Sequence, residues 1–224
     1  MKNIFFLFFI LISFSAQAQK EGPGTWFSYL GTYKVAPRWN IQPNAQARFY
    51  NLGADVHQML LRLGANYHLD QAGKYQVGAG LDYWYNEDYQ SNNIDKFSFT
   101  EVRLFEQLVM KHGSGRFRFM HRFRLENRFV ENKDPSIRFR HLLKTTVALD
   151  KTKKIDPGTF YVALLAEPFW NFKGNPFDRL WVQPMLGYKL NKKWTFEIGN
   201  QTQVLNGNNT NRIQFWAFHN LKLY

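Results

Sequence analysis

The chain has 224 residues, of which 45% are hydrophobic and 18% aromatic, and its formal net charge is +12. This length allows one or two domains, and the load of 22 Phe, 11 Tyr and 7 Trp excludes an intrinsically disordered chain. The absence of cysteine excludes disulfide scaffolds, cysteine-ligated zinc and thiol nucleophiles.

Residues 1–18 have the layout of a secretory signal peptide. A basic start at Lys2 precedes an apolar run at 4–14, and Ala-Gln-Ala at 16–18 has the small-x-small form that signal peptidase accepts. The apolar run is too short to span a membrane as a helix, and no later apolar stretch reaches that length. We therefore predict cleavage after residue 18. The mature chain at 19–224 is then a single domain that can enter a membrane only as strands.

Apolar and polar residues alternate along most of the mature chain. In residues 75–85, apolar side chains such as Leu81 alternate with polar or small ones such as Gln76 and Asp82. In residues 116–130, phenylalanine and leucine alternate with arginine and glutamate. A period of two predicts β-strands with one apolar face and one polar face.

This pattern predicts an all-β fold of about ten to twelve antiparallel strands. The expected strands lie near residues 25–35, 38–50, 55–69, 75–85, 97–112, 116–130, 136–150, 158–170, 178–190, 194–206 and 211–224. Tight turns are expected at 70–74, 111–115 and 191–193, longer loops at 86–96, 131–136, 171–178 and 206–211, and a medium-length connection at 151–158. Short turns on one side and long loops on the other are typical of outer-membrane barrels, which have an even number of strands in bacteria. Eleven segments therefore imply that 25–35 lies outside the wall or that one strand is missed.

Two barrels fit this alternation, and they differ in which face points inward. A soluble, lipocalin-like barrel would turn its aromatic face inward, whereas a membrane barrel would turn its arginine face inward. Strand length favours the membrane barrel, because a tilted membrane strand needs about 9–11 residues and globular strands centre on about 5–6. The aromatic residues also gather at both strand ends, as interfacial belts require. The expected belts are Tyr33, Trp39, Tyr67, Tyr75, Phe117, Phe160, Tyr188 and Trp194 beside the turns, and Phe49, Tyr83, Tyr85, Phe129 and Trp170 toward the loops.

Three segments carry a family resemblance. They are Glu101-Val-Arg103 followed by Gln107, Arg122-Phe-Arg124-Leu-Glu126-Asn-Arg128, and Arg138-Phe-Arg140, with Trp26, Arg48 and Glu167 in matching places. This pattern resembles domain of unknown function 2490, a family of Gram-negative secreted proteins regarded as outer-membrane barrels without an established activity. Asn127 stands where the pattern has Gln. The resemblance implies the fold and an outer-membrane location, and it supplies no catalytic residues.

The polar face is expected to form an ionic cluster in the lumen. Its members are Arg62, Asp82, Glu101, Arg103, Arg122, Arg124, Glu126, Arg128, Arg138, Arg140, Lys144 and Glu167. The assumed turns set Glu101 opposite Glu126, Arg103 opposite Arg124, Arg140 beside Glu126, Arg62 opposite Asp82 and Lys144 opposite Glu167. Buried charges are tolerated only when they are paired and hydrogen-bonded.

This cluster has two interpretations. It can be a polar core that fixes strand register, or its cationic surplus can favour anions that pass through a narrow pore or bind at its mouth. The cations without an obvious partner are Arg48, Arg116, Arg118, Arg122, Arg128, Arg138, Arg179 and Arg212. Lipopolysaccharide phosphates are expected to meet the loop lysines Lys96, Lys133 and Lys173.

A lipid-modifying enzyme is an alternative, because some small barrels use a Ser and a His on the outer wall. Histidines occur on or near the apolar face, at positions 57, 121, 141 and 219, but no serine shares that face at mid-strand; Ser98 and Ser136 lie at loop ends. Glu101 and Glu126 could form an acid–base pair, although arginines surround both. No motif for a metal or another cofactor is present.

We thus expect an outer-membrane barrel, structural or a narrow anion-favouring pore, that is monomeric or weakly oligomeric. A soluble periplasmic ligand-binding barrel remains the other alternative. The signal peptide argues against nucleic acid as a partner, despite the basic charge. The final aromatic residue, Tyr224, resembles the signal that the outer-membrane assembly machinery recognises, so lipids, lipopolysaccharide and that machinery are the expected partners.

Overall fold

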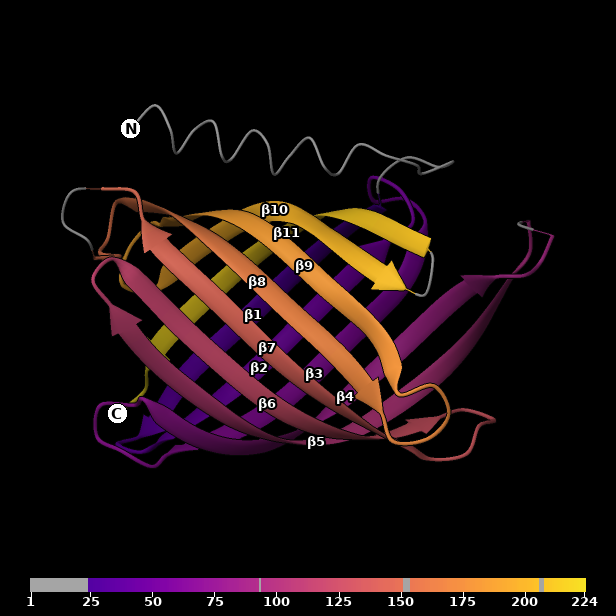
Figure 1. Ribbon diagram of the computed structural model, residues 1–224, viewed down its shortest axis with the longest axis horizontal. Helices are drawn as coiled ribbons and strands as arrows, with labels where there is room; N and C mark the ends of the chain where they lie inside the picture. Colours follow the sequence, from indigo (N-terminus) through magenta and orange to yellow (C-terminus); the bar gives the residue numbers. More distant parts are fainter. Residues whose placement is uncertain (1–23, 93, 151–153, 206–207) are drawn as a thin grey trace.

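The computed structural model describes residues 24–92, 94–150, 154–205 and 208–224. The predicted signal peptide at 1–18 lies outside the described residues. The described residues form eleven β-strands and no helix (Figure 1). The strands are β1 (Gly24–Ala36), β2 (Trp39–Phe49), β3 (Val56–His68), β4 (Tyr75–Tyr89), β5 (Lys96–Ser114), β6 (Phe117–Val130), β7 (Ser136–Ala148), β8 (Thr159–Asn171), β9 (Phe177–Lys189), β10 (Trp194–Leu205) and β11 (Asn208–Lys222).

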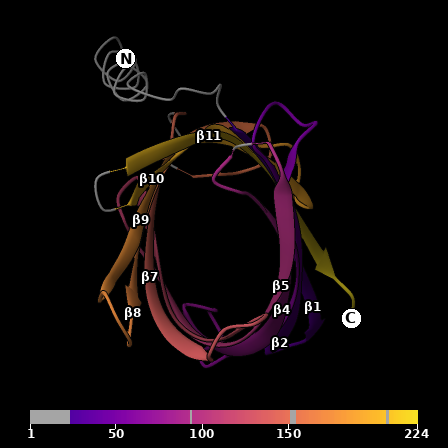
Figure 2. The same cartoon turned by 90° about the vertical axis from the view of Figure 1, so that its right-hand side faces the viewer.

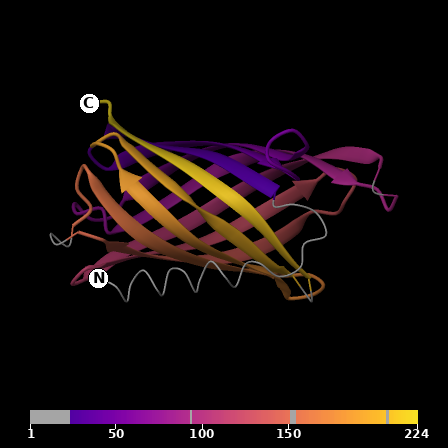
Figure 3. The ribbon, with the colours of Figure 1, turned by 90° about the horizontal axis from the view of Figure 1, so that it is seen from above.

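The strands close into one barrel with an oval cross-section, in which β11 returns to lie beside β1 (Figures 2 and 3). Neighbouring strands are antiparallel except β1 and β11, whose parallel ladder runs from Gly24 opposite Arg212 to Lys34 opposite Lys222. The predicted all-β barrel is confirmed. The expected even strand number is wrong, because the segment at 25–35 lies in the wall as β1. An odd number of strands closes only if one neighbouring pair is parallel, and a parallel ladder still bonds the backbone groups of both strands.

The strand bounds follow the period-two pattern closely, with exceptions on β4, β5 and β11. β11 begins at Asn208, so the longer loop predicted at 206–211 is wrong. β4 continues to Tyr89, and β5 continues through the predicted turn at 111–115 as far as Ser114. The turn is instead the two-residue loop Gly115-Arg116, in which Gly115 has φ 57°. Glycine adopts this left-handed conformation without steric cost and is favoured at the first position of a tight hairpin loop.

We call the end of the barrel at which β1 begins the loop end (right in Figure 1) and the other end the turn end. The predicted contrast in connection length between these two ends holds only in part. The extension of β4 shortens the predicted loop at 86–96 to residues 90–95, and the connection between β7 and β8 at the turn end spans 149–158. Connection length alone therefore does not identify which end faces outward.

Side chains alternate between an apolar outer wall and a filled interior. The outer wall carries aliphatic residues at mid-strand, such as Leu61 and Leu63, which are 63% and 59% exposed. The predicted belt residues lie on this wall, where several touch across strands, as Trp39 and Tyr67 do with ring centroids 5.1 Å apart. No helix in the described part of the chain is long and apolar enough to cross a membrane.

The interior of the barrel contains apolar side chains as well as charged ones. Trp26, Phe169 and Trp181 form one buried cluster, and Tyr161 and Met185 belong to another. These side chains point into the lumen, where the sequence pattern predicted a mainly polar face. Aromatic rings and guanidinium groups together fill the space that the strands enclose.

Candidate functional site

The centre of the ionic cluster is Glu126 on β6, whose side chain is fully buried. Arg140 Nη1 donates to Glu126 Oε1 at 2.6 Å, and Arg138 Nη2 donates to Glu126 Oε2 at 2.6 Å. Both arginines lie on β7, where Arg138 is directly opposite Glu126 and Arg140 is its diagonal neighbour. The predicted contact between Arg140 and Glu126 is therefore present, and each carboxylate oxygen has its own guanidinium donor.

Arg140 extends the network from β7 to β8. Its Nη2 lies 2.9 Å from Glu167 Oε2, so one guanidinium group bridges the carboxylates of Glu126 and Glu167. Arg122 Nη2 donates to Glu167 Oε1 at 2.8 Å. Arg140 also lies over the ring of Phe169, 4.3 Å from its centroid. Buried charges in this region thus have opposite charges, hydrogen bonds and an aromatic face around them.

Two further carboxylates on the same side of the lumen are paired with arginine. Glu101 on β5 accepts from Arg103 Nε at 2.7 Å and from Arg128 Nε at 2.6 Å. Asp82 on β4 accepts from Arg62 Nε and Nη2, both at 2.5 Å, in a bidentate pair directly across the β3–β4 ladder. The prediction that Arg62 faces Asp82 is therefore correct.

Three other predicted pairings are wrong because the register differs. They are Glu101 with Glu126, Arg103 with Arg124, and Lys144 with Glu167. The turn at Gly115-Arg116 shifts the β5–β6 register by four residues, so that Glu101 lies opposite Val130 and Glu126 opposite Phe105. The same shift sets Arg103 opposite Arg128 and Arg124 opposite Gln107.

Lys144 lies opposite Leu165, not opposite Glu167. Its Nζ instead donates across the lumen to Glu197 on β10, at 2.5 Å. A contact across the barrel depends on closure of the sheet, so neighbouring hairpins alone do not predict it.

Four of the eight arginines without an obvious partner contact carboxylates. Arg122 contacts Glu167, Arg128 contacts Glu101, Arg138 contacts Glu126 and Asp178, and Arg179 contacts Asp178. At the turn end, Arg116 and Arg118 donate to backbone carbonyl groups. Arg48 and Arg212 contact no carboxylate among the described residues.

Arg48 on β2 is buried among neutral partners. Its guanidinium carbon lies 3.6 Å from the ring centroid of Trp26 and 4.7 Å from that of Trp84. Its Nη1 and Nη2 donate to the side-chain carbonyls of Gln58 and Gln46, at 2.8 and 3.0 Å. The rings and amides hold the guanidinium group in place, but they leave its positive charge uncompensated.

A cavity of about 430 Å³ that is lined in part by Arg48 lies at the loop end of the lumen. Its lining includes seven Lys or Arg residues and three Asp or Glu residues, a formal surplus of four positive charges with histidine neutral. The basic residues are Arg48, Arg103, Arg128, Lys133, Arg138, Arg179 and Arg212, and the acidic residues are Asp88, Glu101 and Asp134. We call this cavity the mouth.

A family model described as protein of unknown function (DUF2490) matches residues 23–214, which include the three arginine-rich segments. The chain belongs to this family. No curated protein and no solved structure matches the chain. The DUF2490 resemblance predicted from those segments is thus confirmed.

Near the mouth of the DUF2490 barrel, Lys96 joins β4 and β5 to the loop before β3. Its Nζ donates to Glu87 at 3.2 Å and also to Asp55, which accepts a further hydrogen bond from Tyr89 at 2.6 Å. Partial burial works against ionisation of Asp55, but the hydrogen bonds from Lys96 and Tyr89 lower its pKa. Lys96 is therefore engaged within the protein, whereas Lys133 lines the mouth.

One histidine of the DUF2490 barrel, His57, and one candidate serine, Ser136, both line the mouth, whereas His57 was predicted on or near the apolar outer face. His57 lines the mouth, where its Nε2 lies 3.5 Å from Asp88 Oδ1. His121 and His141 face outward and contact each other. In the described part of the chain no serine hydroxyl is hydrogen-bonded to a histidine, and no group of three acidic or histidine side chains is arranged to hold a metal.

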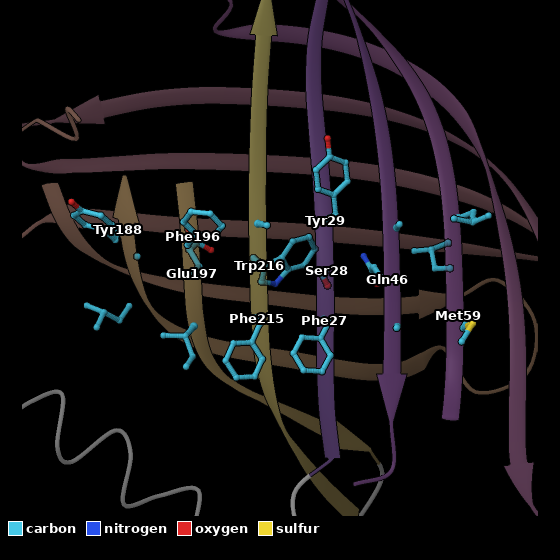
Figure 4. Close-up of a pocket in the computed structure, with 18 of the residues that line it drawn as sticks. Phe27, Ser28, Tyr29, Gln46, Met59, Tyr188, Phe196, Glu197, Phe215 and Trp216 are labelled. Carbon is cyan, nitrogen blue, oxygen red and sulfur yellow. The ribbon is translucent and has the colours of Figure 1, made fainter. Parts of the chain in front are cut away.

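The outer wall across the seam between β1 and β11 is hollowed and apolar (Figure 4). Phe27 and Phe215 stack there, with ring centroids 5.1 Å apart, beside small residues such as Ala45 and Ala217. Toward the turn end, Tyr29 Oη lies 3.0 Å from His219 Nδ1. Aromatic contacts therefore cover the one parallel ladder of the barrel on its outer side.

Proposed function

We propose that this DUF2490 protein is an outer-membrane barrel whose lumen is closed at its middle and whose mouth binds anions. The membrane location is supported by the outer wall. Large apolar side chains, including Leu61, Leu63, Leu81 and Leu164, are exposed at mid-strand on successive parts of this wall. A soluble monomer rarely exposes contiguous apolar patches beyond a few hundred Å², whereas acyl chains would cover this wall.

Side chains right across the middle of the lumen are almost completely buried. This observation favours a closed barrel over a pore. Glu126 and Asp82 on one side and Gln214 on the other are 0% exposed, and Met185 is 1% exposed. Side chains that line a water-filled channel remain accessible to water. The filled middle therefore supports a structural barrel over a narrow conducting pore.

Anion binding at the mouth is supported by its charge balance. Arg103, Arg128 and Arg138 are already paired with carboxylates, but Arg48 and Arg212 are not. An anion in the mouth would compensate these two charges in a site that is partly shielded from water, where charge-assisted hydrogen bonds are strong. Phosphate and carboxylate groups are the chemistry that guanidinium groups recognise best.

Flotation and conductance test the membrane part of this proposal. We expect the refolded protein to float with phospholipid vesicles and to resist carbonate extraction. In a planar bilayer it should give no stepwise current. A protein that is freely soluble without detergent would exclude the membrane location, and steady anion-selective steps would replace the closed barrel with a pore.

Tryptophan fluorescence tests the anion site, because Trp84 and Trp181 border the mouth. We expect inorganic pyrophosphate to change the emission saturably. The double variant Arg48→Gln/Arg212→Gln should weaken this binding by about a hundredfold or more, since each of the two lost charged hydrogen bonds is worth about 1.5–3 kcal/mol. Arg118→Gln at the turn end is the matched control and should bind as the wild type does. Equal binding by all three proteins would exclude the mouth as the site.

A further inference from the structure

Three polar side chains of the outer wall lie near the middle of three neighbouring strands. They are Glu106 on β5, His121 on β6 and His141 on β7. Glu106 is exposed, whereas its neighbours Phe105 and Gln107 are buried in the lumen, so Glu106 faces outward. Among the described residues, Glu106 takes part in no hydrogen bond or ion pair. An ionisable group that faces lipid is costly and marks a functional contact.

His141 has a ring nitrogen to offer such a carboxyl group. Its Nε2 lies 3.2 Å from Nδ1 of His121, and its ring is stacked on that of Phe123, with centroids 4.5 Å apart. These contacts fix the plane of the ring and occupy Nε2. They leave Nδ1 of His141 for another partner.

The strand register places Glu106 and His141 at a defined spacing. Glu106 lies opposite Leu125 on β6, Leu125 lies opposite Phe139 on β7, and His141 follows Phe139 by two residues toward the turn end. Two strand spacings of about 4.8 Å and two residue steps of about 3.3 Å put the two residues about 12 Å apart.

The tilt of the strands brings Glu106 and His141 to nearly the same height along the barrel axis. In Figure 1 the step from β5 across to β7 leads toward the loop end, and the step along β7 from Phe139 to His141 leads back toward the turn end. At a tilt of about 40° these two displacements along the axis nearly cancel. Glu106 and His141 thus differ in position mainly around the wall.

The midpoint between Glu106 and His141 is apolar. Leu125 and Phe123 lie on β6 between the two polar residues, one on the loop side and one on the turn side of the midpoint. This patch has a hydrogen-bond acceptor on one flank, a donor on the other and an apolar centre. Its residues are Glu106, Leu125, Phe123 and His141. Such a surface is complementary to itself under a two-fold rotation.

We infer that this patch is the interface for a second copy of the chain. A two-fold axis parallel to the barrel axis would set Glu106 opposite the partner's His141 on one flank, and repeat that pair on the other. Leu125 and Phe123 would then meet their own counterparts at the centre. The inference rests on the proposed membrane location, because the same axis inserts both barrels in one direction and each polar pair replaces a contact with lipid.

Cysteine crosslinking in vesicles tests this dimer directly, because the natural chain contains no cysteine. Leu125→Cys should form a disulfide-linked dimer on mild oxidation, since position 125 would lie beside its own copy. Ile198→Cys is the matched control, because Ile198 is an exposed apolar residue on the outer wall of β10. Only protein that floats with the vesicles is analysed, so failure of the membrane proposal is seen first, as loss of flotation. Floating protein in which both variants crosslink equally overturns the dimer.

A second set of variants tests the polar pairs within the Leu125→Cys background. Glu106→Leu should lower the dimer yield about three- to tenfold, in the range that polar contacts between membrane segments contribute. A carboxyl group that merely faces lipid predicts an unchanged or higher yield, which would overturn the pairing. Exchange of both partners, Glu106→His with His141→Glu, should restore the dimer. A yield that stays as low as that of Glu106→Leu would exclude the assigned pair.

Discussion

The two sides of the lumen satisfy their polar groups in different ways. On the ionic side, formed by β3 to β8, each oxygen of Glu126 and of Glu167 lies within hydrogen-bonding or ion-pair distance of an arginine. On the amide side, formed by β9 to β11 with β1 and β2, Gln201 and Gln214 are equally buried. Neither side-chain atom of these two glutamines has a hydrogen-bond partner in the described protein.

This difference follows from the cost of burying each kind of group. A buried carboxylate without a partner costs several kcal/mol, so a sequence that buries one must also place a cation within reach. A buried neutral amide costs far less and leaves more freedom in what surrounds it. The ionic pairs therefore specify the register of β3 to β8, while Gln201 and Gln214 on the amide side fill space.

The largest effect is expected where the ionic side depends on one carboxylate. Glu126→Leu leaves Arg138 and Arg140 buried without the charge that lies between them, which costs about 3–5 kcal/mol. Urea unfolding in detergent micelles, followed by the heat-dependent shift of the folded band on a gel, measures this loss. An unchanged unfolding midpoint would mean that the network does not hold the barrel together.

A smaller and partly reversible effect is expected at the isolated pair of Arg62 and Asp82. Arg62→Met leaves Asp82 buried and unpaired and should cost about 3 kcal/mol. Adding Asp82→Leu removes the second charge and should recover most of the loss, because an apolar pair of similar size tolerates the same site. A double variant that is less stable than Arg62→Met alone would contradict this account. The unfolding free energies of all four proteins complete the cycle.

The sequence predicts those features of the fold that are local to one segment of the chain. Strand bounds and the polar face follow from alternation, which is a local property of each segment. The predicted turn at 111–115 is centred on Gly113, whereas the chain turns at Gly115-Arg116, and this difference moves the β5–β6 register by four residues. Parity within a strand could have placed Phe105 in the lumen, because it shares the face of Arg103 and Gln107.

The mouth and the cross-lumen contacts could not be predicted in this way. The pair of Lys144 and Glu197, and the approach of Arg48 to the ring of Trp181, join strands that are distant in the chain. Such contacts depend on how the sheet closes, and closure here uses a parallel pair that alternation does not reveal. The even strand number expected of bacterial barrels was wrong for the same reason.

The smallest effect is expected on the amide side, and its sign distinguishes the two sides most sharply. Gln214→Met replaces a fully buried amide that has no protein partner with an apolar side chain of similar length. This change should leave stability unaltered or raise it by about 1 kcal/mol, since no hydrogen bond is lost and a desolvation cost is removed. Asn66→Leu is the matched control, because Asn66 is an equally buried amide that bonds Asn40 and Gln107. It should lose about 1–3 kcal/mol, as its partners are left unsatisfied. If Gln214→Met destabilises the barrel as much as Asn66→Leu does, the amide side is held by specific interactions. The buried polar groups on both sides of the lumen would then be stabilised in the same way.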